Sequence, residues 1–101
     1  MKTEIKTEGN TMSVMIEGRL DTANAVECEK DFQPLRDNAD KEIVLDCTNL
    51  EYISSSGLRL FLSLRKDVQA QGGKLIIEHI NDDIRNVFTI TGFFKLFDIR
   101  P

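Results

Sequence analysis

The sequence has few of the residues on which metal and redox sites depend. It contains one histidine and only two cysteines, Cys28 and Cys47. These two cysteines are too few and too far apart for a metal-binding knuckle or a redox pair. Cys47 follows an apolar run, and we expect it to behave as a small buried hydrophobe. We therefore expect no metal site, no cofactor and no disulfide.

Long apolar runs are also missing. No run approaches the roughly 20 residues of a membrane-spanning helix. The first residues, Met1–Glu4, lack the charged-then-apolar plan of a signal peptide. The length of 101 residues and the hydrophobic fraction of 41% suit one compact domain over residues 1–101. We expect a cytoplasmic protein with no membrane partner.

The sequence carries no basic stripe. Lys and Arg number 13 against 17 Asp and Glu, which gives a formal charge of −4, and the two signs are interspersed. Nucleic-acid-binding proteins usually present a basic face. We therefore expect no nucleic acid as a partner, while a protein or a small ligand stays open.

Two enzymatic motifs are absent as well. The hydrolase elbow needs Gly-x-Ser-x-Gly, but positions 53 and 54 hold no glycine, and His79 is the single candidate for a histidine base. A glycine-rich phosphate loop of the P-loop kind is not present. We expect no catalytic residues, and the chain is not predicted to be an enzyme or a kinase itself.

Periodicity predicts where the strands and helices lie. Residues 2–8 read as a polar edge strand, and residues 11–17 alternate, with Met12, Val14 and Ile16 on one face. The later segments are predicted, in chain order, to be a helix from about residue 22 that kinks or ends at Pro34, a buried strand at 42–46, a loop at 47–53, a helix at 57–70, a buried strand at 74–79, a helix after Asn81 or Asp82, and a short closing strand or helical turn at 93–99.

This alternation of strands and helices predicts an α/β fold with right-handed parallel crossovers. We expect one mostly parallel sheet of four or five strands with an antiparallel N-terminal edge strand. Three or more helices are expected to pack mainly on one face of that sheet.

Three serines, Ser54–Ser56, precede Gly57 and the best-patterned helix. Serine oxygens cap helix N-termini, and this end of a helix favours an anion such as a phosphate. Ligand and partner sites in parallel sheets gather in the loops beyond the carboxyl ends of the strands. Asp21 and Ser56 each lie in such a loop, so we expect both on the same rim of the sheet. On the residues alone, the serines are interpreted as a plain helix cap and loop, and Asp21 can equally be only a cap or a partner contact.

The stretch Tyr52–Leu58 resembles the signature of STAS domains, specifically of bacterial anti-sigma factor antagonists. That signature runs aromatic, aliphatic, Asp, Ser, Ser, Gly, Leu. The resemblance extends along the chain through Gly18-Arg19-Leu20-Asp21, Val44-Leu45-Asp46, Gly72-Gly73-Lys74-Leu75 and Thr91-Gly92-Phe93.

The resemblance implies a phosphorylation switch. The unphosphorylated antagonist would bind an anti-sigma factor serine kinase and release a sigma factor for transcription. The kinase would then phosphorylate the serine before glycine, and a PP2C-type phosphatase would reverse the step. That serine is Ser56, with Ser55 as the alternative. The sequence departs from the pattern at Ser54, where Asp is usual.

A surface around that serine is expected to bind the kinase, with the exposed side of the following helix as the contact face. Its expected members are Asp21, Thr22, Ser54, Ser55, Ser56, Gly57, Leu58, Arg59, Ser63 and Lys66. The alternative function is a STAS scaffold or transport-accessory module that is not phosphorylated.

Overall fold

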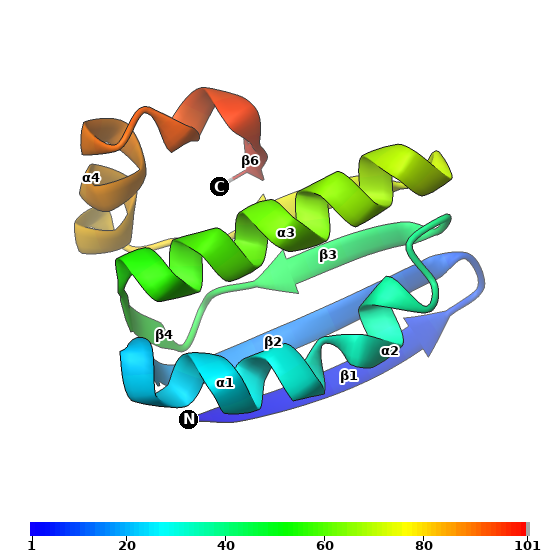
Figure 1. Cartoon of the computed structure of the whole chain (residues 1–101), viewed down its shortest axis with the longest axis horizontal. Helices are drawn as coiled ribbons and strands as arrows, with labels where there is room; N and C mark the ends of the chain where they lie inside the picture. Colours follow the sequence, from blue (N-terminus) through cyan, green and yellow to red (C-terminus); the bar gives the residue numbers. More distant parts are fainter. Residues whose placement is uncertain (101) are drawn as a thin grey trace.

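The computed structural model, which describes residues 1–100, has two layers, with a sheet on one side and helices on the other (Figure 1). The elements are β1 (Lys2–Glu8), β2 (Thr11–Leu20), α1 (Thr22–Asp31), α2 (Gln33–Arg36), β3 (Glu42–Asp46), β4 (Leu50–Ile53), α3 (Ser55–Gln71), β5 (Lys74–Glu78), α4 (Asp82–Ile90), the 3-10 helix η1 (Phe93–Leu96) and β6 (Asp98–Arg100).

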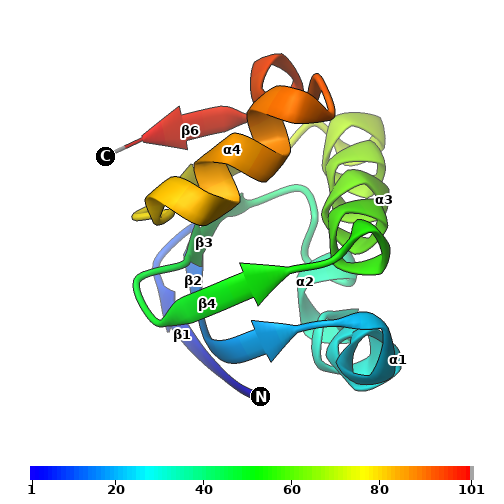
Figure 2. The ribbon, with the colours of Figure 1, turned by 90° about the vertical axis from the view of Figure 1, so that its left-hand side faces the viewer.

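The sheet confirms the predicted fold class. Strands lie in the order β1-β2-β3-β5-β6, with β1 antiparallel to β2 and the other neighbours parallel. Helices α1, α2 and α3 cover one face, as expected (Figures 1 and 2). The described residues form six strands, because a short strand, β4, pairs with the last part of β2.

The prediction of a loop over residues 47–53 is wrong for the second half of that segment. Residues 50–53 form β4, and β2 continues to Leu20 rather than ending at residue 17. Strand β4 buries only its two end residues, Leu50 and Ile53, and exposes the two between them. A four-residue strand with that pattern shows no alternation, so periodicity could not reveal it.

Capping residues explain where the helices begin and end. Helix α1 ends at Asp31, and Pro34 falls in the first turn of α2, where its missing N–H breaks no helical hydrogen bond. This confirms the predicted interruption. Helix α3 begins at Ser55, two residues earlier than predicted, and ends at Gln71, followed by the C-cap Gly72 in the left-handed conformation (φ 78°).

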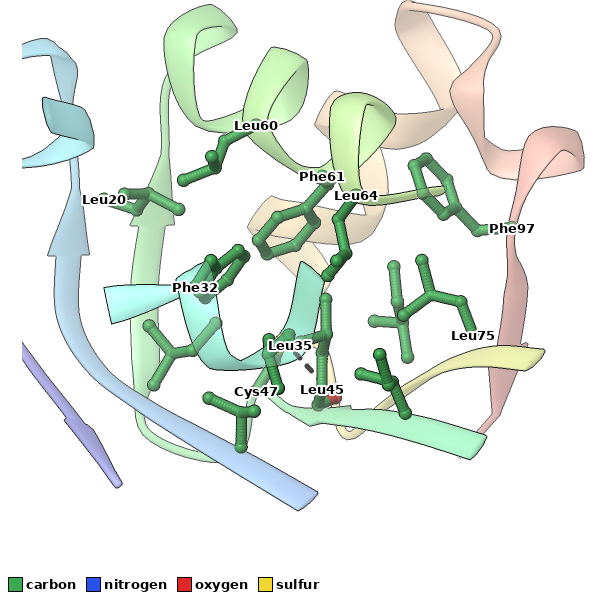
Figure 3. Close-up of a cluster of buried hydrophobic side chains, with 14 of the residues drawn as sticks. Leu20, Phe32, Leu35, Leu45, Cys47, Leu60, Phe61, Leu64, Leu75 and Phe97 are labelled. Carbon is green, nitrogen blue, oxygen red and sulfur yellow. Dashed lines mark hydrogen bonds between the residues drawn. The ribbon is translucent and has the colours of Figure 1, made fainter. Parts of the chain in front are cut away.

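The core lies between the sheet and the helices. Met12, Val14 and Ile16 face it from β2, as predicted, and a row of phenylalanine rings crosses it. The rings are those of Phe32, Phe61, Phe88 and Phe97, with adjacent centroids 5.6–6.5 Å apart, and three of them are labelled in Figure 3. Such ring pairs add specific packing energy to the burial of apolar area.

Both cysteines are free and belong to this core. Burial raises the pKa of the Cys28 thiol to about 12, and the nearby carboxylates of Asp31 and Glu27 add to the rise. Burial likewise raises the pKa of the Cys47 thiol to about 12, with a smaller contribution from Asp46. Both thiols therefore stay protonated near neutral pH, and neither has the thiolate character of a reactive cysteine.

Candidate functional site

Two helix N-termini meet at one edge of the sheet. Strands β2 and β4 run parallel, with Leu20 opposite Ile53, and each leads directly into a helix (Figure 2). The backbone N–H of Ser54 donates to the carbonyl oxygen of Leu20 at 2.9 Å, just where both strands end. Because the positive ends of α1 and α3 therefore lie together, this edge favours negative charge.

Each of the two helices has a side-chain cap. Asp21 Oδ1 accepts from the backbone N–H of Asn24 at 2.9 Å, and Ser54 Oγ accepts from the N–H of Gly57 at 3.3 Å. Ser54 is thus the N-cap of α3, in the position where the family signature usually has Asp. Since one serine supplies the cap, the hydroxyls of Ser55 and Ser56 are not needed for it.

Gly57 allows α3 to lie directly on the two strands. A Cβ atom built at Gly57 would lie 2.8 Å from both Ile53 Cγ1 and Leu20 Cγ, closer than real Cβ contacts allow. Glycine is therefore needed at this position because it has no side chain. The backbone conformation there would suit other residues. This contact fixes the height of the serine segment, Ser54–Ser56, above the sheet.

A groove of about 390 Å³ separates α1 from α3. We call it the α1–α3 groove. Its lining residues are Thr22, Ala25, Val26 and Glu29 of α1, Arg36 of α2, and Ser56, Arg59, Leu60 and Ser63 of α3. Val26 is 65% exposed, so a large apolar side chain stands at the groove without a covering group.

The serines of the segment differ in their surroundings. Ser55 is exposed and lies outside the groove lining, whereas Ser56 is half-buried and belongs to it. Ser56 is the second residue of α3, where free backbone N–H groups and the helix dipole favour an attached anion. A change in charge on Ser56 would therefore be felt directly by whatever occupies the groove.

The far end of the groove is held by an ion pair between α2 and α3. Arg36 donates through one guanidinium nitrogen to Ser63 Oγ at 3.0 Å and to Asp67 Oδ2 at 2.5 Å. The Arg36 side chain is 16% exposed. Sequence reasoning missed Arg36, because the short helix that carries it packs on a helix distant in sequence.

The structure brings together about half of the predicted surface residues. Thr22, Ser56, Arg59 and Ser63 line the groove, and Asp21, which is the N-cap of α1, directly precedes Thr22. The lining residues of α1 beyond Thr22 were missed. Their spacing on an ordinary amphipathic helix carried no distinguishing signal.

Two predicted contact residues offer no surface to a partner. Leu58 is 1% exposed and packs in the core, and Gly57 is buried beneath the first turn of α3. Lys66 is exposed but lies outside the groove lining. Burial of Leu58 follows from its position on the inner side of α3, whose inner face rests on the sheet.

Two further features bear on the chemistry of this site. Among residues 1–100, no group of three or more His, Cys, Asp or Glu side chains is placed to hold a metal ion. None of the helices in that range is both long and apolar enough to span a bilayer. What the site does offer is an open groove with Ser56 in its lining.

The fold and the groove together define a small α/β domain with two helix N-termini paired at one edge of its sheet. The family model described as "STAS domain" matches residues 2–101. The chain belongs to the STAS domain family.

Two proteins that the chain resembles carry names of anti-sigma factor antagonists. The chain is 33% identical over 84 residues to BtrV of Bordetella bronchiseptica, which is named as an anti-sigma factor antagonist, covering 83% of this chain and 72% of that one. A crystal structure from Thermotoga maritima, titled as an anti-sigma factor antagonist, superposes with a TM-score of 0.87 at 21% identity, covering 96% of this chain and 84% of that one.

The Bacillus protein SpoIIAA has the same fold. Its phosphorylated form superposes with a TM-score of 0.73 at 18% identity, covering 99% of this chain and 92% of that one. Its unphosphorylated form, titled as an anti-sigma factor antagonist, gives a TM-score of 0.74 at 17% identity. At these identities the two structures support the fold alone.

Proposed function

We propose that this protein is an anti-sigma factor antagonist in the cytoplasm of a bacterium. Its unphosphorylated form binds an anti-sigma factor serine kinase and thereby releases a sigma factor. The kinase phosphorylates Ser56, which ends the binding, and a PP2C-type phosphatase restores it. The names of the relatives support the antagonist role, and the phosphorylated form of SpoIIAA supports phosphorylation as a property found within this fold.

One observation carries the proposal, which is the position of Ser56. Ser56 lines the α1–α3 groove, as does Val26, whose apolar side chain is exposed, and it lies at the positive end of α3. A protein that fills this groove must cover the hydroxyl. The same residue can therefore be both a contact in the complex and the acceptor of the phosphate.

The energetics of a phosphate at Ser56 favour a switch. A phosphoserine carries roughly −1.5 to −2 charges at neutral pH. In the free domain that charge stays solvated and is stabilised by the start of α3. A docked partner would remove its water beside apolar groups, which costs several kcal/mol unless new partners replace the water. Each ~1.4 kcal/mol of this penalty weakens binding tenfold.

The test is phosphorylation by the anti-sigma factor kinases encoded in the same genome. Each candidate is incubated with the protein and ATP, and the products are analysed by intact mass and by fragmentation that localises the phosphate. We expect one added phosphate, placed on Ser56. Addition of a PP2C-type phosphatase from the same genome should return the original mass.

Matched serine variants separate the alternatives. Ser56→Ala should abolish the added mass, whereas Ser55→Ala should leave it. Loss with Ser55→Ala alone would move the acceptor to the exposed serine. A protein that binds a partner but gains no phosphate with any candidate kinase would favour the STAS scaffold instead.

A further inference from the structure

Asn81 joins the start of α4 to β4, the strand that leads into the serine segment. Strand β4 pairs with β2 along one side, and the first turn of α4 lies on its other side (Figure 2). There Asn81 Nδ2 donates to the carbonyl oxygen of Leu50 at 3.2 Å and to that of Glu51 at 3.4 Å. Its Oδ1 accepts from the backbone N–H of Ile84 at 2.8 Å. One side chain therefore caps α4 and covers edge carbonyls of β4.

The backbone just before Asn81 adopts a costly conformation. His79 has φ 62°, and no other non-glycine residue among residues 1–100 has a positive φ. The left-handed region costs a residue with a Cβ about 1 kcal/mol or more. Such conformations persist where the surroundings determine them, and they gather near functional sites. Here the strained residue leads from the end of β5 to the Asn81 anchor.

Strand β4 carries the effect of this anchor to the serine segment. Glu51, whose carbonyl Asn81 contacts, lies three positions before Ser54, and the strand between them is only Leu50–Ile53. Ser54 is tied in turn to Leu20 by its backbone N–H. A shift of β4 along or away from β2 would therefore move the start of α3.

We propose that Asn81 is a positioning residue for the phosphate acceptor, acting through β4. This inference rests on the proposed function for the role of Ser56. Asn81 does not line the α1–α3 groove and caps a different helix. Its amide group holds the strand that sets the place of Ser54–Gly57 over the sheet.

Two substitutions remove the amide donor and keep the cap. Asn81→Ser and Asn81→Asp each retain an oxygen that can accept from the N–H of Ile84, so α4 should persist in both. Asn86→Ser is the matched control. It lies on the exposed side of the same helix, and its side chain makes no hydrogen bond to other residues within 1–100.

Amide hydrogen exchange of the free protein, followed by NMR, is the first readout. We expect the Ser54 N–H to exchange about tenfold faster in both Asn81 variants, in keeping with one lost hydrogen-bond anchor. Amides of β3 and β5 should keep their rates, and Asn86→Ser should change neither group. Equal acceleration across all protected amides, or none at Ser54, would overturn the proposal.

The second readout is phosphorylation kinetics with the kinase identified for the wild-type protein. The kcat/KM for Asn81→Ser should fall about three- to tenfold, while Asn86→Ser stays at the wild-type value. Faster exchange at Ser54 with unchanged kcat/KM would refute the positioning role. Lack of phosphorylation of the wild-type protein would instead refute the proposed function, and the exchange data would still decide whether Asn81 anchors β4.

Discussion

At the scale of single residues, Ser54 explains how this chain tolerates a departure from its family signature. The signature usually has Asp at this position, and Ser54 supplies the same capping oxygen to the N–H of Gly57. Ser and Asp are both favoured N-caps. Asp adds a negative charge at the positive end of the helix, which Ser lacks.

Substitution at Ser54 should therefore separate capping from charge. Ser54→Ala should lower the free energy of unfolding by about 1 kcal/mol. With Ser54→Asp, the free energy of unfolding should equal the wild-type value or exceed it by up to about 0.5 kcal/mol. Urea denaturation of the free domain measures both. Equal stability of the Ala and Asp variants would show that Ser54 does not cap α3.

Gly57→Ala should destabilise the domain, although alanine usually stabilises a helix by roughly 0.5–1 kcal/mol relative to glycine. The new Cβ would lie 2.8 Å from two buried side chains, those of Leu20 and Ile53. Overpacking of this kind costs about 1–3 kcal/mol. Urea denaturation should show a net loss, with Ser55→Ala as an exposed control. A gain in stability would mean that α3 can move away from the strands.

At the scale of elements, the sequence was sufficient for the long, regular segments and insufficient for the short ones. The alternation over residues 11–17 and the buried run at 42–46 gave β2 and β3. The four-residue β4 was missed because a parallel neighbour distant in sequence, not its own pattern, holds it in place. The start of α3 was placed two residues late because three consecutive serines each suit a cap.

Helices α2 and α3 are joined by Arg36 and Asp67, and this pair should contribute measurably to stability. A double-mutant cycle with Arg36→Gln and Asp67→Asn should give a coupling energy of about 1 kcal/mol, because the Arg36 side chain is only 16% exposed. The Asp98–Arg100 pair has side chains that are 43% and 47% exposed and is the control. Its coupling should lie near zero, and equal couplings for the two pairs would contradict this account.

At the scale of the whole molecule, the site arises from the topology. Parallel pairing of β2 with β4 delivers two helix N-termini to one edge, and the spacing of α1 and α3 leaves the groove between them. The rim that carries Asp21 and Ser56 could be predicted from the order of strands and helices. The groove could not, because it depends on how far apart two helices settle on a shared core.

The same core makes the stability of the molecule sensitive to alkaline pH. Burial raises the pKa of both thiols to about 12, above the ordinary value of 9.0. The contribution of the protonated thiols to the free energy of unfolding is fully present below about pH 9. It is lost as the pH rises toward 12, because the thiols of the unfolded chain release their protons at lower pH than those of the folded protein. Between these pH values each thiol lowers the free energy of unfolding by up to ~1.4 kcal/mol per pH unit.

Urea denaturation between pH 8 and pH 11 tests this point. The loss of unfolding free energy with pH should be shallower in the variant carrying both Cys28→Ala and Cys47→Ala than in the wild-type protein. The cavities that the alanines leave lower the stability by the same amount at every pH, so they do not affect the comparison of slopes. Identical slopes would show that the thiols do not remain protonated in the folded protein.

The affinity of the protein for the proposed anti-sigma factor kinase, measured by calorimetry before and after phosphorylation of Ser56, tests the central claim most directly. We expect the Kd to rise at least about 100-fold on phosphorylation, equivalent to ~2.7 kcal/mol. Melting of the free protein should show that the phosphorylated form stays folded. An unchanged Kd, with Ser56 fully phosphorylated and the domain folded, would contradict the switch.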